Sequence, residues 1–436
     1  MSALRFDILG RSQAPGIRAR VGRITTPHGS FDTPAFMPVG TRGTVKGLLP
    51  HLVSATGSQI LLNNTYHLLL RPGPETVEKL GGVHRFMGWD APILTDSGGY
   101  QAYSMADINA VDDEGVTFRS IVDGSRVRLT PERATRVQNQ LGADIIMAFD
   151  DCPPSVVDAG AAASAEDSPE ASAAVGPAGP VPAADPRLSK AIRRDTRALR
   201  GYDHARRLRI ANERTVRWLE RCKAAHARPD EQALFGIIQG GTDLEQRSWS
   251  AQRITSIDLP GYAIGGVAVG EEFDQIRAVV RHTTPLMPED KPRYLMGVGY
   301  EQDILAAVLA GVDMFDCVRP TRNGRNANAF TRSGQIRLRN AGFAQDAGPI
   351  EEGCDCPACD PARHGWRTPE GRPFSRGYLR HLFQADEMLG PILVSLHNVR
   401  YFQRLMADVR RTILDGDWQG LVGRWPRASA ALEGVV

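Results

Sequence analysis

The stretch RYLMGVGYEQDILAAVLAGVDMFDCV, residues 293–318, contains the most informative pattern of the chain. It begins with a short apolar run, RYLMGVG, continues with a helical segment from Tyr300 to Leu309, and ends with a second apolar run, VDMFDCV. Runs of strand length that are rich in branched and aromatic residues are typical of strands buried on both faces. The stretch therefore predicts a strand, a covering helix and a second strand parallel to the first.

Similar apolar runs occur throughout the preceding part of the chain. They are PAFMPVG from Pro34, QILLNN from Gln59, PILTD from Pro92, DIIMAFD from Asp144, ALFGIIQ from Ala233 and YAIGGVAV from Tyr262. Helical segments lie between them, such as residues 130–141, where Thr130 can cap the helix and Pro131 occupies its first position. Buried strands that alternate with helices in this way predict an α/β fold, a (β/α)8 TIM barrel, with an open doubly wound sheet as the alternative.

Length and composition limit the other possibilities. The 436 residues exceed the roughly 250 of a typical barrel of this kind, so additional segments are expected. A net charge of +2 means that any surface for nucleic acid is a local patch. No run approaches the roughly 18 apolar residues of a membrane span, and residues 1–20 lack the apolar segment of a secretory signal. We therefore expect a cytoplasmic protein without a membrane partner.

Two segments interrupt the alternation of strands and helices. Residues 155–187 consist almost entirely of Ala, Gly, Pro, Ser, Val and acidic residues and contain no aromatic side chain, which predicts a disordered insertion after the fourth strand. Residues 190–228 are strongly basic and helical in pattern. This helix could face RNA or could simply be a solvated outer helix.

A cluster of three cysteines predicts a metal site. Cys354, Cys356 and Cys359 form a C-x-C-x-x-C pattern, and thiolates this close together repel one another unless a cation binds them. A tetrahedral Zn²⁺ site needs a fourth ligand, and the downstream candidates are His364, His381 and His397, of which we favour His397. A closed Cys3His set would make the zinc structural, with one ion per chain.

Six residues, most of them polar, occupy the carboxyl ends of the predicted strands. They are Asp96, Asp150, Gln239, Gly266, Met296 and Asp316. The carboxyl ends of the strands form the catalytic face of such barrels. Two carboxylates there, Asp96 and Asp316, suit a displacement at the anomeric carbon of a sugar, with one as nucleophile and the other as acid and base.

The neighbouring residues suggest a pocket for a planar base and a patch for phosphate. Tyr100 offers a stacking face, Gly265 and Gly266 offer backbone N–H groups, and Gln239 and Asp150 offer hydrogen-bonding side chains. The phosphate patch would consist of Arg319, Arg322 and Arg325, although a solvated loop would have a similar composition.

These motifs resemble the tRNA-guanine transglycosylases, also called queuine tRNA-ribosyltransferases. The resemblance extends from about Phe6 to Gln403 and rests on LLNNTYHL, LTDSGGYQ, MAFDDCP, FGIIQGG, GYAIGGVAVGE, YLMGVG, MFDCVRPTRNGRNA, CDCPAC and EMLGPILVSLHN in this order. It implies exchange of the guanine at the wobble position of a tRNA anticodon for a deazaguanine base. It also implies that Asp316 is the nucleophile that attacks the ribose C1′ and that Asp96 is the general acid and base.

The resemblance extends to the binding residues and the partners. It implies that Asp150, Gln239 and Gly266 read the edge of the base, that Tyr100 and Met296 enclose its ring, and that His397 completes the zinc site. In bacterial relatives the region around Phe374 helps to form a homodimer. Val269 in GGVAVGE looks bacterial, which implies that the incoming base is 7-aminomethyl-7-deazaguanine, the prequeuosine base, rather than queuine.

The domain division follows from these motifs. We expect a catalytic barrel over residues 1–340, a zinc-binding subdomain with a closing helix over residues 341–410, and a tail over residues 411–436.

Two other classes of protein fit parts of the sequence pattern: a non-catalytic RNA-binding subunit and a barrel glycosidase that acts on free sugars. The presence of both Asp96 and Asp316 disfavours the first, and the position of most of the six Trp outside the strand-end motifs disfavours the second.

Overall fold

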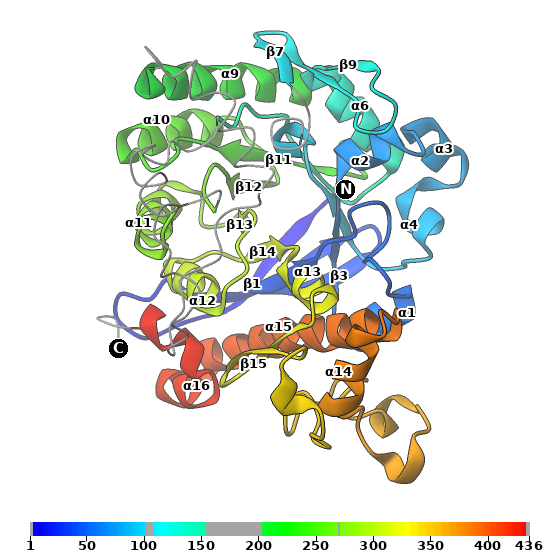
Figure 1. Cartoon of the computed structure of the whole chain (residues 1–436). Coiled ribbons are helices and arrows are strands. Elements are labelled where there is room, and N and C mark those ends of the chain that lie inside the picture. The colour runs from blue at the N-terminus through cyan, green and yellow to red at the C-terminus, as the bar shows by residue number, and fades with distance from the viewer. Residues whose placement is uncertain (1–2, 102–107, 154–202, 269–270, 433–436) are drawn as a thin grey trace.

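The centre of the molecule is a ring of eight parallel strands, as the sequence predicts. The computed structural model describes residues 3–101, 108–153, 203–268 and 271–432 (Figure 1). The strands are β4 (Ala35–Pro38), β5 (Leu61–Asn63), β6 (Ile93–Thr95), β10 (Ile145–Met147), β11 (Ala233–Ile238), β12 (Gly261–Ile264), β13 (Arg293–Leu295) and β14 (Met314–Cys317). They pair in chain order, β14 pairs with β4, and a bridge between Val39 and Leu62 closes the ring. This closure excludes the open doubly wound sheet.

Helices surround the ring and cover its outer face (Figure 1). They are α1 (Pro50–Ala55), α2 (Thr65–Leu70), α3 (Pro74–Lys79), α4 (Gly82–Met87), α6 (Pro131–Leu141), α9 (His204–Ala225), α10 (Leu244–Thr255), α11 (Phe273–Thr283) and α12 (Glu301–Ala310). Helix α6 begins as its sequence predicts, with the Thr130 side chain accepting a hydrogen bond from the Arg133 N–H at 3.3 Å. The predicted insertion and the first third of the basic segment lie outside the described residues, whereas α9 forms most of the remainder.

A small antiparallel sheet lies at the amino ends of the barrel strands. It consists of β1 (Arg5–Arg11), β2 (Arg20–Thr26) and β3 (Gly29–Thr33). The Arg20 side chain forms a fully buried ion pair with Asp313, which precedes β14. His28 and His84 stack and each donates to a different oxygen of the buried Asp144 before β10, at 2.9 and 3.0 Å. These contacts attach the sheet to the end of the barrel opposite the predicted catalytic face.

A second antiparallel sheet follows β6. It consists of β7 (Ile108–Asp112), β8 (Gly115–Arg119) and β9 (Arg126–Leu129). The indole N–H of Trp218 on α9 donates to the carbonyl of Asp113 at 2.7 Å, which joins α9 to the turn between β7 and β8.

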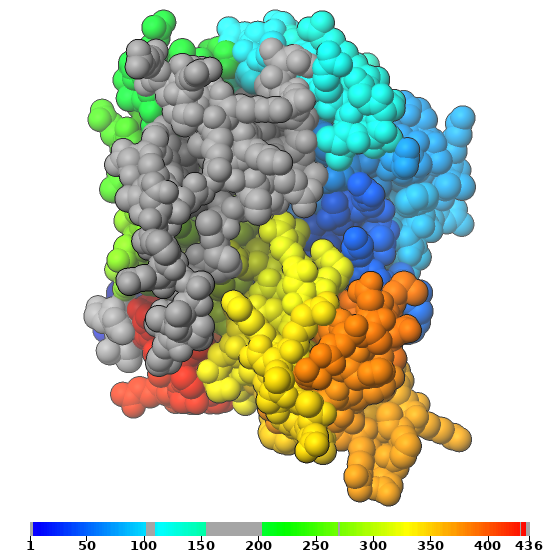
Figure 2. All heavy atoms as spheres, viewed as in Figure 1, coloured from blue at the N-terminus to red at the C-terminus, as the bar shows by residue number. Residues whose placement is uncertain are grey.

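The C-terminal part of the chain extends the barrel at one side, where Figure 2 shows it as the yellow, orange and red surface. Its elements are α13 (Arg319–Arg325), β15 (Asn328–Thr331), β16 (Gly334–Arg337), α14 (Arg376–Gln384), α15 (Leu389–Asp415) and α16 (Trp418–Arg424). Helix α15 packs against the barrel: the Gln403 amide donates to the carbonyl of Phe36 in β4 at 3.0 Å, and the Phe36 and Phe402 rings stack. No helix in the described part of the chain has the length and hydropathy needed to cross a bilayer.

Candidate active site and metal centre

The first of the two predicted carboxylates, Asp96, directly follows β6 and is almost fully buried. Its Oδ2 accepts hydrogen bonds from the side-chain amides of Asn64 (2.5 Å) and Gln101 (2.8 Å). Its Oδ1 accepts from the backbone N–H of Thr65 at 2.8 Å. Burial raises the pKa of Asp96 to about 6 against these hydrogen bonds, and the negative charge of Asp316 raises it further. A carboxyl group with this pKa can both give and take a proton near neutral pH.

The second carboxylate, Asp316 in β14, is only partly buried. The Tyr294 hydroxyl donates to its Oδ1 at 2.6 Å, and the Gly297 N–H donates to the same oxygen at 2.7 Å. Within the described residues no group donates a hydrogen bond to Oδ2. Burial raises the pKa of Asp316, and the hydrogen bond from Tyr294 opposes the rise. The carboxylate thus has one oxygen fixed by the protein and one oxygen open to a ligand.

A third carboxylate, Asp150, lies beside the first two at the same end of the barrel. The Ser97 hydroxyl donates to its Oδ1 at 2.9 Å, and the Gln239 amide donates to its Oδ2 at 2.6 Å. Burial raises the pKa of Asp150 to about 6. A methyl group added at Gly99 would lie 3.0 Å from the carbonyl oxygen and 3.2 Å from Oδ1 of Asp150, so the two segments are tightly packed where they meet. The structure therefore brings Asp150 and Gln239 together as one hydrogen-bonded unit.

The two glycines after β12 differ in what they can offer a ligand. The N–H of Gly265 donates to the carbonyl of Ile238 at 3.0 Å, so the prediction that both glycines present free N–H groups is wrong for Gly265. Strand pairing of β11 with β12 continues one residue beyond the strands and uses this group. Gly266 follows with a φ of +64°, and its carbonyl accepts from Arg247 at 3.1 Å. No described residue accepts a hydrogen bond from the Gly266 N–H, which makes it the member of the pair better suited to bind a ligand.

For the guanine that the sequence resemblance implies as substrate, we expect Gly266→Ala to weaken binding at least tenfold. The added Cβ would lie 2.2 Å from Oε1 of Gln239, so Gln239 would have to leave its position beside Asp150. The left-handed backbone adds about 1 kcal/mol of strain for alanine. Gly416→Ala is the matched control, because Gly416 has a φ of +79° but no atom within 4 Å of the added methyl. An unchanged guanine KM in Gly266→Ala, with both variants folded by circular dichroism, would contradict this role of the glycine.

The two residues predicted to enclose the ring of the base lie at the same rim. Tyr100 is 40% exposed and lies in the helical segment that begins at Gly99, shortly after β6. Met296 follows β13, is partly buried against the interior of the barrel, and its N–H donates to the carbonyl of Ile264 at 3.2 Å. Val269 lies outside the described residues.

The three arginines of the predicted phosphate patch lie on a short helix, α13, and not in a loop. Arg319, Arg322 and Arg325 recur every third residue, and α13 begins directly after the strand that carries Asp316. None of the three forms an ion pair with a described residue, and Arg322 is exposed. Three unneutralised guanidinium groups next to the carboxylates make this helix basic.

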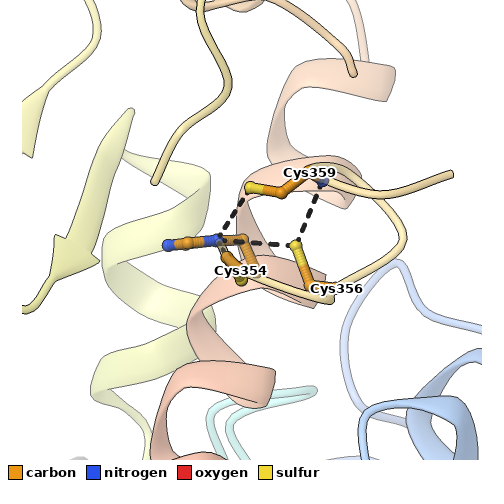
Figure 3. A group of neighbouring side chains, drawn as sticks. Cys354, Cys356 and Cys359 are labelled. Carbon is orange, nitrogen blue, oxygen red and sulfur yellow. Dashed lines mark hydrogen bonds between the residues drawn. The ribbon is translucent and has the colours of Figure 1, made fainter. Parts of the chain in front are cut away.

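The predicted zinc ligands converge at one point (Figure 3). Nδ1 of His397 lies 3.6, 3.5 and 3.5 Å from the sulfur atoms of Cys354, Cys356 and Cys359, and all four side chains are buried. A tetrahedral Zn²⁺ with its usual bond lengths separates a sulfur and a nitrogen ligand by about 3.6 Å. Nε2 of His397 donates to the carbonyl of Phe330 at 2.7 Å, which leaves Nδ1 deprotonated for the metal. The cluster therefore fits a structural zinc ion.

Of the three candidate histidines, only His397 joins the cysteines. The His364 side chain instead contacts the carbonyl of Asp355 at 2.8 Å, and the His381 ring stacks on Tyr378. His397 lies in the buried middle of α15, whereas His381 lies on α14. The preference for His397 is confirmed.

Comparison with known proteins identifies the family. The sequence matches the family model described as queuine tRNA-ribosyltransferase over residues 16–172 and 199–431, which is most of the chain. The chain belongs to this family. The unmatched residues 173–198 overlap the insertion expected at residues 155–187, which indicates that this segment departs from the family pattern.

Individual queuine tRNA-ribosyltransferases are similar to this chain along nearly its whole length. The protein of that name from Thermus thermophilus is 49% identical over 416 residues, which are 95% of this chain and 92% of the relative. The one from Symbiobacterium thermophilum is 46% identical over 432 residues, or 98% and 93% of the two chains. The one from Acetivibrio thermocellus is 44% identical over 415 residues, or 95% of each.

Asn64 and Tyr294, which hold the two carboxylates in this member of the queuine tRNA-ribosyltransferase family, were not predicted from the sequence. Asn64 lies in the quoted motif LLNNTYHL directly after the second strand, so its position at a strand end was a usable signal. Tyr294 lies inside the apolar run of β13 and looks like an ordinary core residue. Pairing of β13 with β14 brings its hydroxyl to Asp316 on the neighbouring strand.

Proposed function

We propose that this chain exchanges guanine at the wobble position of a tRNA anticodon for 7-aminomethyl-7-deazaguanine, through a covalent bond between Asp316 and the ribose, in queuosine biosynthesis. The geometry of Asp316 is the observation that carries the proposal, because one carboxylate oxygen is fixed by Tyr294 and Gly297 while the other is open at the barrel rim. Membership of the queuine tRNA-ribosyltransferase family supports the same activity.

In the first half of the reaction, Oδ2 of Asp316 attacks C1′ of the ribose. The electron pair of the glycosidic bond moves to the departing guanine, and Asp96 gives that base a proton. The pKa of about 6 supports this role, because it leaves part of the Asp96 population protonated near neutral pH. The single-stranded anticodon loop allows the base to be turned out at low cost.

In the second half, Asp96 takes a proton from the incoming base. A nitrogen of that base attacks C1′, and the bond to Asp316 breaks with its electron pair returning to the carboxylate. The covalent ester retains the activation of C1′, so no other nucleotide is consumed. Asp96 ends the cycle in the protonation state in which it began.

The base pocket that we propose consists of Asp150, Gln239 and Gly266, with Tyr100 and Met296 on the two faces of the ring. Asp150 accepts from the N–H edge of the purine, and Gln239 and the Gly266 N–H bind its carbonyl oxygen. The shared hydrogen bond between Asp150 and Gln239 supports this arrangement, since each side chain orients the other.

The affinity for guanine should fall as the pH drops below about 6. Asp150 must be ionised to accept from the base, and its pKa of about 6 means that it takes up a proton in this range. Well below pH 6 we expect about a tenfold loss of affinity per pH unit. Asp150→Asn should bind guanine weakly and independently of pH, whereas Asp96→Asn should keep the pH dependence. A guanine Kd in the parent chain that stays constant from pH 7 to 5 would contradict this role of Asp150.

The partners follow from the same surfaces. We propose that Arg319, Arg322 and Arg325 bind phosphates of the anticodon loop. The lack of acidic partners for these arginines among the described residues supports this role.

We also propose a homodimer, because Met388 is 79% exposed and Tyr378 is 41% exposed on the C-terminal segment. A sedimentation coefficient of a monomer at micromolar concentration would exclude the dimer. The division into a barrel, a zinc-binding subdomain and a tail stays part of the proposal.

An exchange assay distinguishes the proposed function from its rivals. The zinc-loaded chain is incubated with unmodified tRNA and radiolabelled guanine, and then with unlabelled prequeuosine base or queuine. We expect label to enter the RNA and to be displaced by the prequeuosine base but not by queuine. RNA binding without incorporation would indicate a non-catalytic RNA-binding subunit. Release of free guanine without incorporation would indicate a glycosidase.

A further inference from the structure

Tyr300 and Arg319 form an unusually close stack beside Asp316. The Arg319 guanidinium carbon lies 3.7 Å from the centre of the Tyr300 ring. The other arginine–aromatic pairs of the described chain have separations of 5.1 to 6.0 Å. Only the Tyr300–Arg319 separation corresponds to a guanidinium lying flat in contact with the ring. Tyr300 precedes α12 at the rim, and Arg319 is the first residue of α13, three residues after Asp316.

Close packing between the two loops holds this stack in place. A methyl group at Gly299 would lie 2.4 Å from the sulfur of Cys317 and 3.3 Å from Cδ of Arg319. The loop after β13 therefore touches the chain on both sides of the nucleophile segment. Cys317, which follows Asp316, is buried, so the contact between Gly299 and Cys317 leaves little room for either loop to move.

The stack does not serve to neutralise a charge within the protein. Among the described residues, no carboxylate lies within ion-pair distance of Arg319 and no group accepts a hydrogen bond from its guanidinium. Asp303, in the first turn of α12, interacts with the charge of Arg319 only at longer range. Asp303 is buried, and burial raises its pKa to about 6 against the effect of Arg319. The Tyr300 ring thus fixes the plane of a cation whose N–H groups stay available.

We infer that Tyr300 is a positioning residue that holds Arg319 flat, so that the guanidinium edge binds a phosphate of the RNA next to the ribose that Asp316 attacks. The inference rests on the proposed function. A planar guanidinium with a fixed orientation suits a bidentate contact with phosphate, and fixing it in advance avoids ordering a long side chain on binding. Lysine at this position would keep the charge but lose the stack and the bidentate geometry.

The test compares Tyr300→Leu, Tyr300→Phe, Arg319→Gln and the double variant Tyr300→Leu/Arg319→Gln. We expect Tyr300→Leu to raise the KM for tRNA about fivefold to tenfold, with kcat and the KM for guanine almost unchanged. Tyr300→Phe keeps the ring and should behave as the parent chain. The double variant should be no worse than Arg319→Gln. Trp249→Leu is the matched control, because Trp249 faces Arg253 at 5.8 Å on α10 and should leave the KM for tRNA unchanged.

Salt dependence provides a readout that a purely structural role would not change. Loss of one phosphate contact should lower the slope of log affinity against log salt by about 0.7 to 0.9 in Arg319→Gln, and by less in Tyr300→Leu. Equal KM values for tRNA in Tyr300→Leu and the parent chain would overturn the inference, as would parallel losses in kcat and the KM for guanine.

The inference and the proposed function can fail separately. If the parent chain incorporates no guanine, the proposed function is wrong. The same variants can then be compared by fluorescence anisotropy with a labelled anticodon stem-loop RNA. Weaker RNA binding by Tyr300→Leu than by Tyr300→Phe would still support the stack as a phosphate-binding element, and equal binding would overturn it.

Discussion

Replacing Asp316 by Asn should abolish guanine exchange, lowering kcat by about 10⁴-fold or more. The proposed attacking oxygen is Oδ2, and an amide has neither the negative charge nor the nucleophilicity to form the ester. Asparagine can still accept from Tyr294 and Gly297 through Oδ1, so the local structure should persist. The measurement is incorporation of radiolabelled guanine into tRNA under single-turnover conditions.

Two controls separate lost chemistry from lost structure. Asp303→Asn changes a buried carboxyl of the same rim, whose pKa burial raises to about 6 and to which we assign no contact with substrate, and it should retain exchange within about threefold. Binding of the anticodon stem-loop by Asp316→Asn should equal that of the parent chain. An Asp316→Asn variant that exchanges guanine, with its mass confirming that no deamidation has occurred, would remove the nucleophile from the mechanism.

Loss of a zinc ligand should have the largest effect on stability. We expect Cys356→Ser to reduce bound zinc from one ion per chain to less than about 0.1 and to lower the melting temperature by more than about 10 °C, because structural zinc contributes about 10–16 kcal/mol of binding free energy in small zinc domains. Without the cation, the remaining thiols and His397 would stay buried side by side without compensation. The measurements are metal analysis and thermal unfolding, with a strong chelator as a second route to the same state.

The effect should extend from the zinc site to the rim. His397 lies on α15, and this helix packs closely against α13: a methyl group at Gly324 would lie 2.6 Å from the Ser395 hydroxyl. Disorder of α15 would therefore displace the arginines of α13 and raise the KM for tRNA. Cys222→Ala is the matched control, because Cys222 is fully buried but lies outside the cluster. Full zinc content in Cys356→Ser would contradict the assignment of this ligand.

The sequence predicts the barrel well because the fold repeats one physical pattern. Runs such as ALFGIIQ and VDMFDCV are apolar on both faces and end in a polar residue, and each corresponds to a strand of the ring. The zinc cluster is predictable for a similar reason, since three of its ligands lie within six consecutive residues. The choice of His397 needed the resemblance, because spacing alone left three histidines.

Contacts made by pairing of neighbouring barrel strands were not predictable from local patterns. Tyr294 reads as a core residue until strand pairing places its hydroxyl on Asp316. Gly265 looks like a ligand-binding glycine, but pairing between β11 and β12 uses its N–H. The small sheets β1–β3 and β7–β9 also escaped prediction, because their short strands are only partly apolar. Local patterns predict elements, whereas these roles depend on which elements become neighbours.

Direct mapping of the covalent intermediate tests the central claim. The chain is mixed with an anticodon stem-loop RNA and guanine, denatured in acid during turnover, and digested with nuclease and protease for mass spectrometry. The mechanism predicts a ribose-derived mass on the peptide that contains Asp316, absent from Asp316→Asn. Active exchange with the adduct on Asp96, or with no adduct under conditions that preserve an ester, would contradict it.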